Sequence, residues 1–127
     1  MDLSDAMIGQ VLIPVEDLEH AIPFYRDVLG LQFLFAAPPQ MSFFQCGNVR
    51  LLVGVHEHGR RRERGSQIYF NVGDIHAVHE TLSERGVVFH AAPHVVHRTA
   101  ESELWLAEFA DPDGNPLALM SEVAVQE

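Results

Sequence analysis

The sequence predicts an α+β fold built from two tandem β-α-β-β-β modules. The same order of patterns occurs twice along the 127 residues. Apolar and polar residues first alternate as in a strand, apolar residues then recur at helical spacing, and further strand-like runs follow. Several residues also match between the two halves at a nearly constant separation, as expected of a duplication. A hydrophobic content of 47% with 20% charged residues is typical of a globular chain, and the length favours a single domain over residues 1–127.

Module 1 spans residues 7–55. Its first nine residues alternate as a strand does, and Asp17 is a suitable N-cap for an amphipathic helix that ends at Gly30. Three further strands are predicted, at residues 31–35, 41–46 and 49–55. The last two are joined by Gly47-Asn48, a pair typical of a two-residue hairpin turn.

Module 2 spans residues 66–122 and begins in the same way. A strand-like run at residues 67–72 precedes Asp74, the expected N-cap of a second helix that ends at Gly86. The matching pairs that support a duplication are Gln10 with Gln67, Val15 with Val72, and Asp17 with Asp74.

The remainder of module 2 is less regular. Residues 87–90 are predicted to form a strand, and the long segment 91–102 could fold over a ligand as a lid that carries His94 and His97. The final hairpin turns at residues 111–115, and its Gly114-Asn115 pair matches Gly47-Asn48 of module 1. An arginine-rich loop at residues 56–65, which could bind an anion, joins the modules.

Each predicted helix can cover only one face of the sheet in its module. The two sheets are therefore expected to form a curved mixed sheet around a cleft. The uncovered faces that line this cleft are the natural place for a ligand.

Charge and composition exclude several partners and reactions. Eighteen acidic residues against eight basic ones give a net charge of −10, which repels nucleic acid and anionic membranes. The basic residues are all arginines, so chemistry that needs a lysine is excluded. The single Cys46 excludes an intramolecular disulfide. The first residues lack the features of a signal peptide and no apolar run is long enough to span a bilayer, so a cytoplasmic location is expected.

Two stretches resemble the vicinal oxygen chelate superfamily, which includes glyoxalase I, extradiol dioxygenases and bleomycin resistance proteins. They are VEDLEHAIPFYRDVLGL at residues 15–31, and DPDGN at residues 111–115 with the Leu-Ala-Leu that follows Pro116. The resemblance implies the glyoxalase/bleomycin resistance/dioxygenase fold and, commonly, a homodimer. It does not define the reaction, because the superfamily hosts several chemistries.

Metal-dependent members of this superfamily hold one divalent ion with four side chains on the first and last strands of the modules. The resemblance carries these positions over to Gln10, Leu51, Gln67 and Ala118. Leucine and alanine have no donor atoms, and two neutral amides are a poor site for a divalent cation. We therefore expect neither a metal nor another cofactor.

Strand alternation extends the predicted ligand face to neighbouring residues. The predicted ligand-contacting residues are Gln10, Leu12, Phe44, Leu51, Gln67, Tyr69, Asn71, Ala118 and Met120. Glu108 falls opposite Ala118 if residues 111–115 form a type I turn with a bulge at Gly114. A slip of one residue would instead turn Glu108 away and place Trp105 on this face.

Two functions remain open from the sequence. The first is a metal-independent protein that binds a small, partly apolar organic ligand in the cleft, with no nucleic-acid or membrane partner. The alternative is an enzyme related to glyoxalases or dioxygenases, with isomerase, lyase or oxygenase chemistry. Such an enzyme would use a shifted metal site, or Glu108 as a general base.

Overall fold

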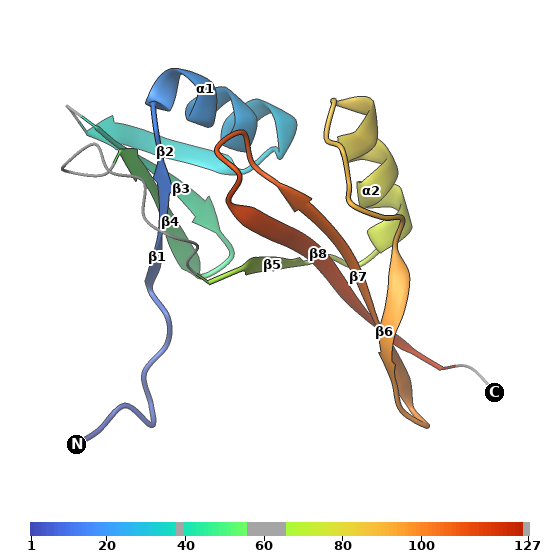
Figure 1. Ribbon diagram of the computed structural model, residues 1–127. Coiled ribbons are helices and arrows are strands. Elements are labelled where there is room, and N and C mark those ends of the chain that lie inside the picture. Colours follow the sequence, from blue (N-terminus) through green and yellow to red (C-terminus); the bar gives the residue numbers. More distant parts are fainter. Residues whose placement is uncertain (38–39, 56–65, 126–127) are drawn as a thin grey trace. The chain divides into compact units, whose positions relative to one another are not determined.

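The computed structural model describes residues 1–37, 40–55 and 66–125. The chain forms two compact units, Met1–Glu63 and Arg64–Glu127, and each contains one four-stranded sheet and one helical region (Figure 1). The predicted arginine-rich loop at 56–65 lies outside the described residues. Among the helices that the structure describes, none has the length and apolar character needed to cross a membrane.

The sheet of unit 1 has the strand order β1-β4-β3-β2, in which β1 and β4 are parallel and the other pairs antiparallel. Its strands are β1 (Gln10–Val15), β2 (Gln32–Ala37), β3 (Met41–Cys46) and β4 (Val49–Val55). The predicted hairpin between β3 and β4 is confirmed. Gly47 in its turn has a φ of 57°, a backbone conformation that glycine adopts without steric cost.

The helical region of unit 1 consists of α1 (Leu18–Pro23) and a π-helical turn, η1 (Phe24–Val28). The predicted N-cap is confirmed, because the side chain of Asp17 accepts a hydrogen bond of 2.9 Å from the backbone N–H of His20. The helical region packs against β3 and β4. Its residue Tyr25 is fully buried, and the ring lies 5.9 Å from that of Phe44 on β3.

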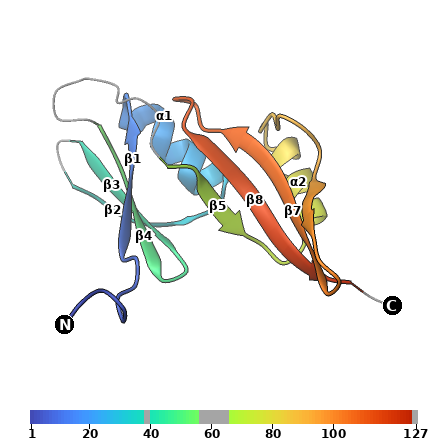
Figure 2. The same ribbon diagram turned by 60° about the horizontal axis from the view of Figure 1, so that its bottom comes forward.

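The sheet of unit 2 has the equivalent order β5-β8-β7-β6. Its strands are β5 (Ile68–Asn71), β6 (His94–Arg98), β7 (Ser102–Ala110) and β8 (Pro116–Ala124). Helix α2 (Ile75–Glu84) packs against β7 and β8, and Figure 2 shows it beside this sheet. Asp74 caps the helix as predicted, since its side chain accepts a hydrogen bond of 3.1 Å from the N–H of Ala77.

One predicted strand of module 2 is wrong. Residues 87–90 do not form a strand, and the edge strand β6 lies in the segment that was predicted to be a lid. Their hydrophobic character has another cause. Val87 is buried, and the ring of Phe89 lies 4.4 Å from His79 of α2 and 5.1 Å from Phe109 of β7. These residues therefore fill the space beside the helix.

Candidate ligand-binding faces

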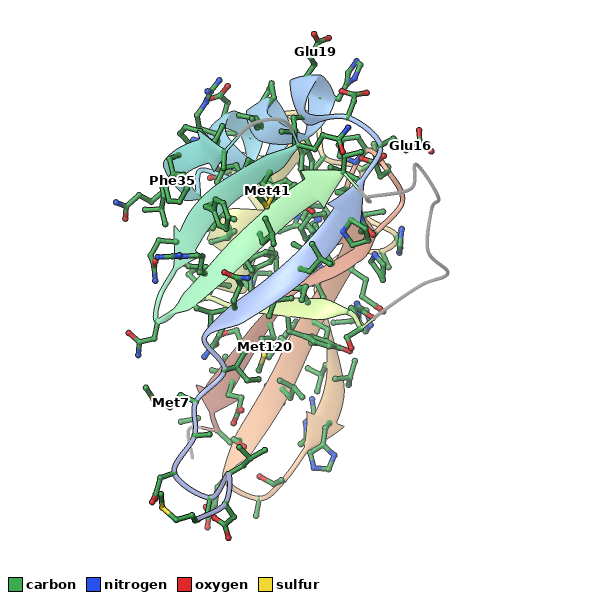
Figure 3. All side chains as sticks on the ribbon, turned by 90° about the vertical axis from the view of Figure 1, so that its left-hand side faces the viewer. Met7, Glu16, Glu19, Phe35, Met41 and Met120 are labelled. Carbon is green, nitrogen blue, oxygen red and sulfur yellow. The ribbon has the colours of Figure 1, made fainter. Side chains whose placement is uncertain are left out.

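Each sheet has one face packed against its helical region and an opposite face, here called the open face, over which the described part of its unit places no helix. In unit 1 several apolar side chains on the open face remain accessible: Leu12 is 52% exposed, Phe35 46% and Met41 38%. Figure 3 shows Phe35 and Met41 projecting from this sheet. Contiguous apolar surface of this kind commonly marks a binding site.

The side chains on the open face of unit 1 lie in rows that cross the four strands. The first row is polar and contains Gln10, Arg50, Gln45 and Gln32. The second row is apolar and contains Leu12, Leu52, Phe43 and Phe35. The predictions that Gln10 and Leu12 share this face are therefore confirmed.

The prediction that Leu51 and Phe44 share this face with Gln10 is wrong. Leu51 is in register with Val11 rather than with Gln10, and it is 2% exposed. Phe44 is its partner on β3, as predicted, but this pair faces the helix, and Phe44 is fully buried. The residues that occupy the open face in their place are Leu52 and Phe43.

The error arose from the two hairpin turns. Matching Gly47-Asn48 to Gly114-Asn115 assumes that the turns have equal length. The turn between β3 and β4 contains only residues 47 and 48, whereas the turn between β7 and β8 contains residues 111–115. Because side chains alternate between faces along a strand, an offset of one residue exchanges the two faces of β4.

In unit 2 the predicted ligand residues do share one face. Tyr69 and Asn71 of β5 are in register with Ala118 and Met120 of β8, and Glu108 of β7 lies opposite Ala118. Of the two registers that the sequence left open for this strand, the structure has the one with Glu108 opposite Ala118. Trp105 faces the other way, with its ring 4.9 Å from that of His76 on α2. Figure 3 shows Met120 projecting from the sheet of this unit.

Gln67, directly before β5, brings an amide to the same face. Its Nε2 atom donates a hydrogen bond of 3.0 Å to Oε2 of Glu108. Both side chains are partly buried, and Ala118 beside them is fully buried. The amide therefore fixes the orientation of the only carboxylate among the ligand residues predicted for unit 2.

The open face of unit 2 also carries two histidines from β6. A bulge at Val96 places His94 opposite Leu106 and His97 opposite Leu104, so both share the face of Glu108. Without the bulge, residues three apart would face opposite ways. The sequence did not place these two histidines on one strand face, because no residue in this segment indicates a β-bulge.

Cys46 ends β3 and is partly buried. Burial raises the pKa of its thiol, because removal from water disfavours the thiolate. The reactive form of this side chain is therefore disfavoured.

The duplicated β-α-β-β-β unit defines the class of fold, and sequence comparison gives the family. The chain belongs to the Glyoxalase/Bleomycin resistance protein/Dioxygenase superfamily, whose family model matches residues 7–119. Comparison with curated proteins gives no significant match.

Solved structures agree with this assignment. A member of the same superfamily from Sphaerobacter thermophilus DSM 20745 shares 29% sequence identity with a TM-score of 0.73, covering 91% of this chain and 97% of that chain. Lactoylglutathione lyase from Agrobacterium tumefaciens shares 22% identity with a TM-score of 0.72, covering 91% and 93%. The integron cassette protein HFX_CASS4 from the Halifax Harbour sewage outfall shares 19% identity with a TM-score of 0.75, covering 91% and 98%. The last two show the shared fold alone.

The residues at the metal positions of the metal-dependent members do not fit a divalent ion. With the corrected register these positions are Gln10, Leu52, Gln67 and Ala118. Two of them have no donor atom, and one amide is already bonded to Glu108. Within the described ranges, no three His, Cys, Asp or Glu side chains form a group that could hold a metal. Hard and borderline divalent ions require more anionic or imidazole donors than this set provides.

Proposed function

We propose that the protein is a metal-independent member of its superfamily that binds a small, partly apolar organic molecule on the open sheet faces. The observation that carries this proposal is that Leu52, Ala118 and two glutamines occupy the positions at which metal-dependent members have their metal ligands. The same faces retain accessible apolar side chains with a few polar groups among them, which is the usual composition of a small-molecule site.

The first experiment measures metal binding by the purified full chain. Elemental analysis gives the metal content, and calorimetric titration with Ni²⁺, Zn²⁺, Mn²⁺ and Fe²⁺ gives affinities. We expect substoichiometric metal and weak binding of all four ions. Tight binding of any one of them at one ion per chain contradicts the proposal.

The second experiment identifies ligands by thermal shift against a library of small organic molecules. A ligand that binds only the folded state raises the apparent stability by an amount that increases with ligand concentration. Leu12→Asp and Tyr69→Ala change exposed side chains on the two open faces, so we expect them to reduce the shift. Glu80→Gln on the exposed surface of α2 is the control and should leave it unchanged.

A second function is favoured by one specific contact, the hydrogen bond from Gln67 to Glu108. This bond holds Oε2 of the carboxylate, while no described hydrogen bond engages Oε1. A carboxylate fixed in this way is suited to accept a proton from an acidic C–H group of a bound ligand and return it to a neighbouring atom, an isomerisation that needs no oxidant and no metal.

Glu108→Gln separates the two functions. If the protein only binds its ligand, the affinity of this variant should fall by no more than the loss of one hydrogen bond explains, roughly 10-fold. If Glu108 transfers a proton, turnover should disappear while binding remains. Glu103→Gln is the matched control, because Glu103 lies on the opposite face of the same strand and pairs with Arg98 at 2.7 Å.

A further inference from the structure

We propose that the open face of unit 1 binds a small planar aromatic carboxylate, with Arg50 as the residue that pairs with the carboxylate group. The inference rests on the proposed function and names the chemical class of ligand for one of the two open faces. Three features of unit 1 support it: an isolated positive charge, a pair of stacked aromatic rings, and a row of neutral amides.

The first feature is the charge of Arg50. It is the only charged residue in the described strands β1 to β4, and it is exposed on the open face. No ion pair is described for Arg50, whereas Arg26 pairs with Asp27 and Arg98 pairs with Glu103. In a chain with a net charge of −10, this guanidinium keeps its fork of donors for an external anion.

The second feature is an aromatic surface beside that charge. The rings of Phe35 and Phe43 stack with their centroids 4.6 Å apart and their planes at 29°. The guanidinium carbon of Arg50 lies 5.7 Å from the centroid of the Phe43 ring. This contact positions the cation over the aromatic surface without neutralising it. An incoming aromatic ring can therefore extend the stack while its carboxylate meets Arg50.

The third feature is the pair of amides that flank Arg50 in the polar row. Gln10 stands on β1 and Gln45 on β3, each in register with Arg50. Nε2 of Gln45 donates a hydrogen bond of 2.7 Å to the carbonyl of Gly47, which fixes this amide and leaves its oxygen as an acceptor. Neutral amides can bond a polar substituent of the ligand and add no charge that would oppose the carboxylate.

The described strands of unit 1 favour a ligand with one negative charge. A polyanion such as a nucleotide requires several cations, and β1 to β4 supply one. A purely aliphatic acid would use the charge but not the stacked rings. The apolar row continues through Leu52 to Leu12, which extends the surface available to the hydrophobic part of the ligand.

The test uses the full chain with 1-naphthoate as the probe and 1-naphthamide as its neutral counterpart. Calorimetry measures the two affinities, and amide chemical shifts in NMR spectra identify the strands that the probe contacts. Arg50→Met removes the charge and keeps much of the aliphatic stem. Arg26→Met is the control, since Arg26 is exposed and already paired with Asp27 at 2.9 Å.

We expect naphthoate to bind the unmodified chain and to shift resonances of β1, β3 and β4. Loss of a hydrogen-bonded charge contact should weaken its binding to Arg50→Met roughly 10- to 100-fold. The affinity for naphthamide should change by less than about twofold in the same variant, because no charge contact is lost. Arg26→Met should bind both probes as the unmodified chain does, and unchanged circular dichroism spectra should show that both variants are folded.

Equal affinity of naphthoate for Arg50→Met and the unmodified chain overturns the inference, as do shifts confined to β5–β8. Binding of neutral apolar compounds without binding of naphthoate also overturns it, but leaves the proposed function intact. Tight stoichiometric metal binding, in contrast, overturns the proposed function. Shifts on β1–β4 that depend on protein concentration alone would assign the face to a second copy of the chain, and would overturn the inference as well.

Discussion

The two adjacent phenylalanines of β3 provide a direct test of the strand register in unit 1. Phe44 is fully buried, with its ring 5.4 Å from that of Phe33 and 5.9 Å from that of Tyr25. Truncation of a fully buried phenylalanine to alanine costs about 3–5 kcal/mol, through lost burial and the cavity left behind. Phe44→Ala should therefore remove a large part of the total stability, which is about 5–15 kcal/mol for a typical domain.

Phe43→Ala should have a much smaller effect on folding. Phe43 is only partly buried, and its described ring contacts are the stack with Phe35 and the guanidinium of Arg50. Loss of these two contacts should cost about 1–2 kcal/mol. The two variants remove the same group from neighbouring positions, so each is the control for the other.

Urea denaturation followed by circular dichroism measures both free energies of unfolding. We expect Phe44→Ala to be less stable than Phe43→Ala by about 2 kcal/mol or more. If Phe43→Ala were equally or more destabilised, the assignment of Phe44 to the core and of Phe43 to the open face would be wrong. The placement of Leu52 and Arg50 on the open face would then be wrong too, because all three positions follow from the same register.

Three further predictions concern the site, one helix cap and one buried hydrogen bond. Ala118→Glu places a second carboxylate in a fully buried position opposite Glu108. Urea denaturation at pH 7 should show a free energy of unfolding that is lower by about 2 kcal/mol or more. The loss should be smaller at lower pH, because protonation removes the repulsion between the two carboxylates. An equal loss at both pH values would contradict this reading. Hydrogen bonds from His20, first from its side chain and then from its backbone, lower the pKa of the Asp17 carboxyl below its usual value. The carboxylate of Asp17 therefore stabilises the fold at any pH above the usual pKa, and this stabilisation is lost as the pH falls through the lowered pKa. The difference in free energy of unfolding between the unmodified chain and Asp17→Ala should therefore shrink in acid. A difference that grew in acid would contradict the predicted direction of the pKa shift. Ser42→Ala removes a buried hydroxyl that donates a hydrogen bond of 2.7 Å to a β4 carbonyl, so it should cost about 1 kcal/mol, whereas no measurable change would show that this bond is dispensable.

The fold could be predicted from the sequence because its signals are local and repeated. Asp17 and Asp74 cap the two helices, and Gly47-Asn48 closes a hairpin, as their residue types indicate. For Glu108 the sequence left two registers open, and the form of the Asp111–Asn115 turn favours the one that is observed. In this turn the side chain of Asp111 accepts hydrogen bonds from the backbone N–H groups of Asp113 and Asn115 at 2.9 and 2.8 Å.

Two parts of the candidate site could not be predicted in this way. The face of Leu51 depends on the exact length of a turn, and a similarity between two Gly-Asn pairs does not measure that length. The position of β6 depends on tertiary packing. Val87 and Phe89 have the composition of a strand but fill space beside α2, whereas the mostly exposed residues 94–98 form the edge strand through pairing with β7.

The duplication also shows how the two open faces have diverged. Gln10 and Gln67 occupy equivalent positions, and the strand registers then make Leu52 equivalent to Ala118 and Phe43 equivalent to Glu108. At one structural position, unit 1 therefore carries an aromatic ring beside a cation, and unit 2 carries a carboxylate bonded to an amide. The faces offer opposite charges on the same scaffold. A ligand with an aromatic acid group suits the first face, whereas a ligand with a hydrogen-bond donor or an acidic C–H suits the second. The proposed binding of an aromatic acid and the proposed proton transfer would therefore depend on different residues, and Arg50→Met and Glu108→Gln can separate the two proposals.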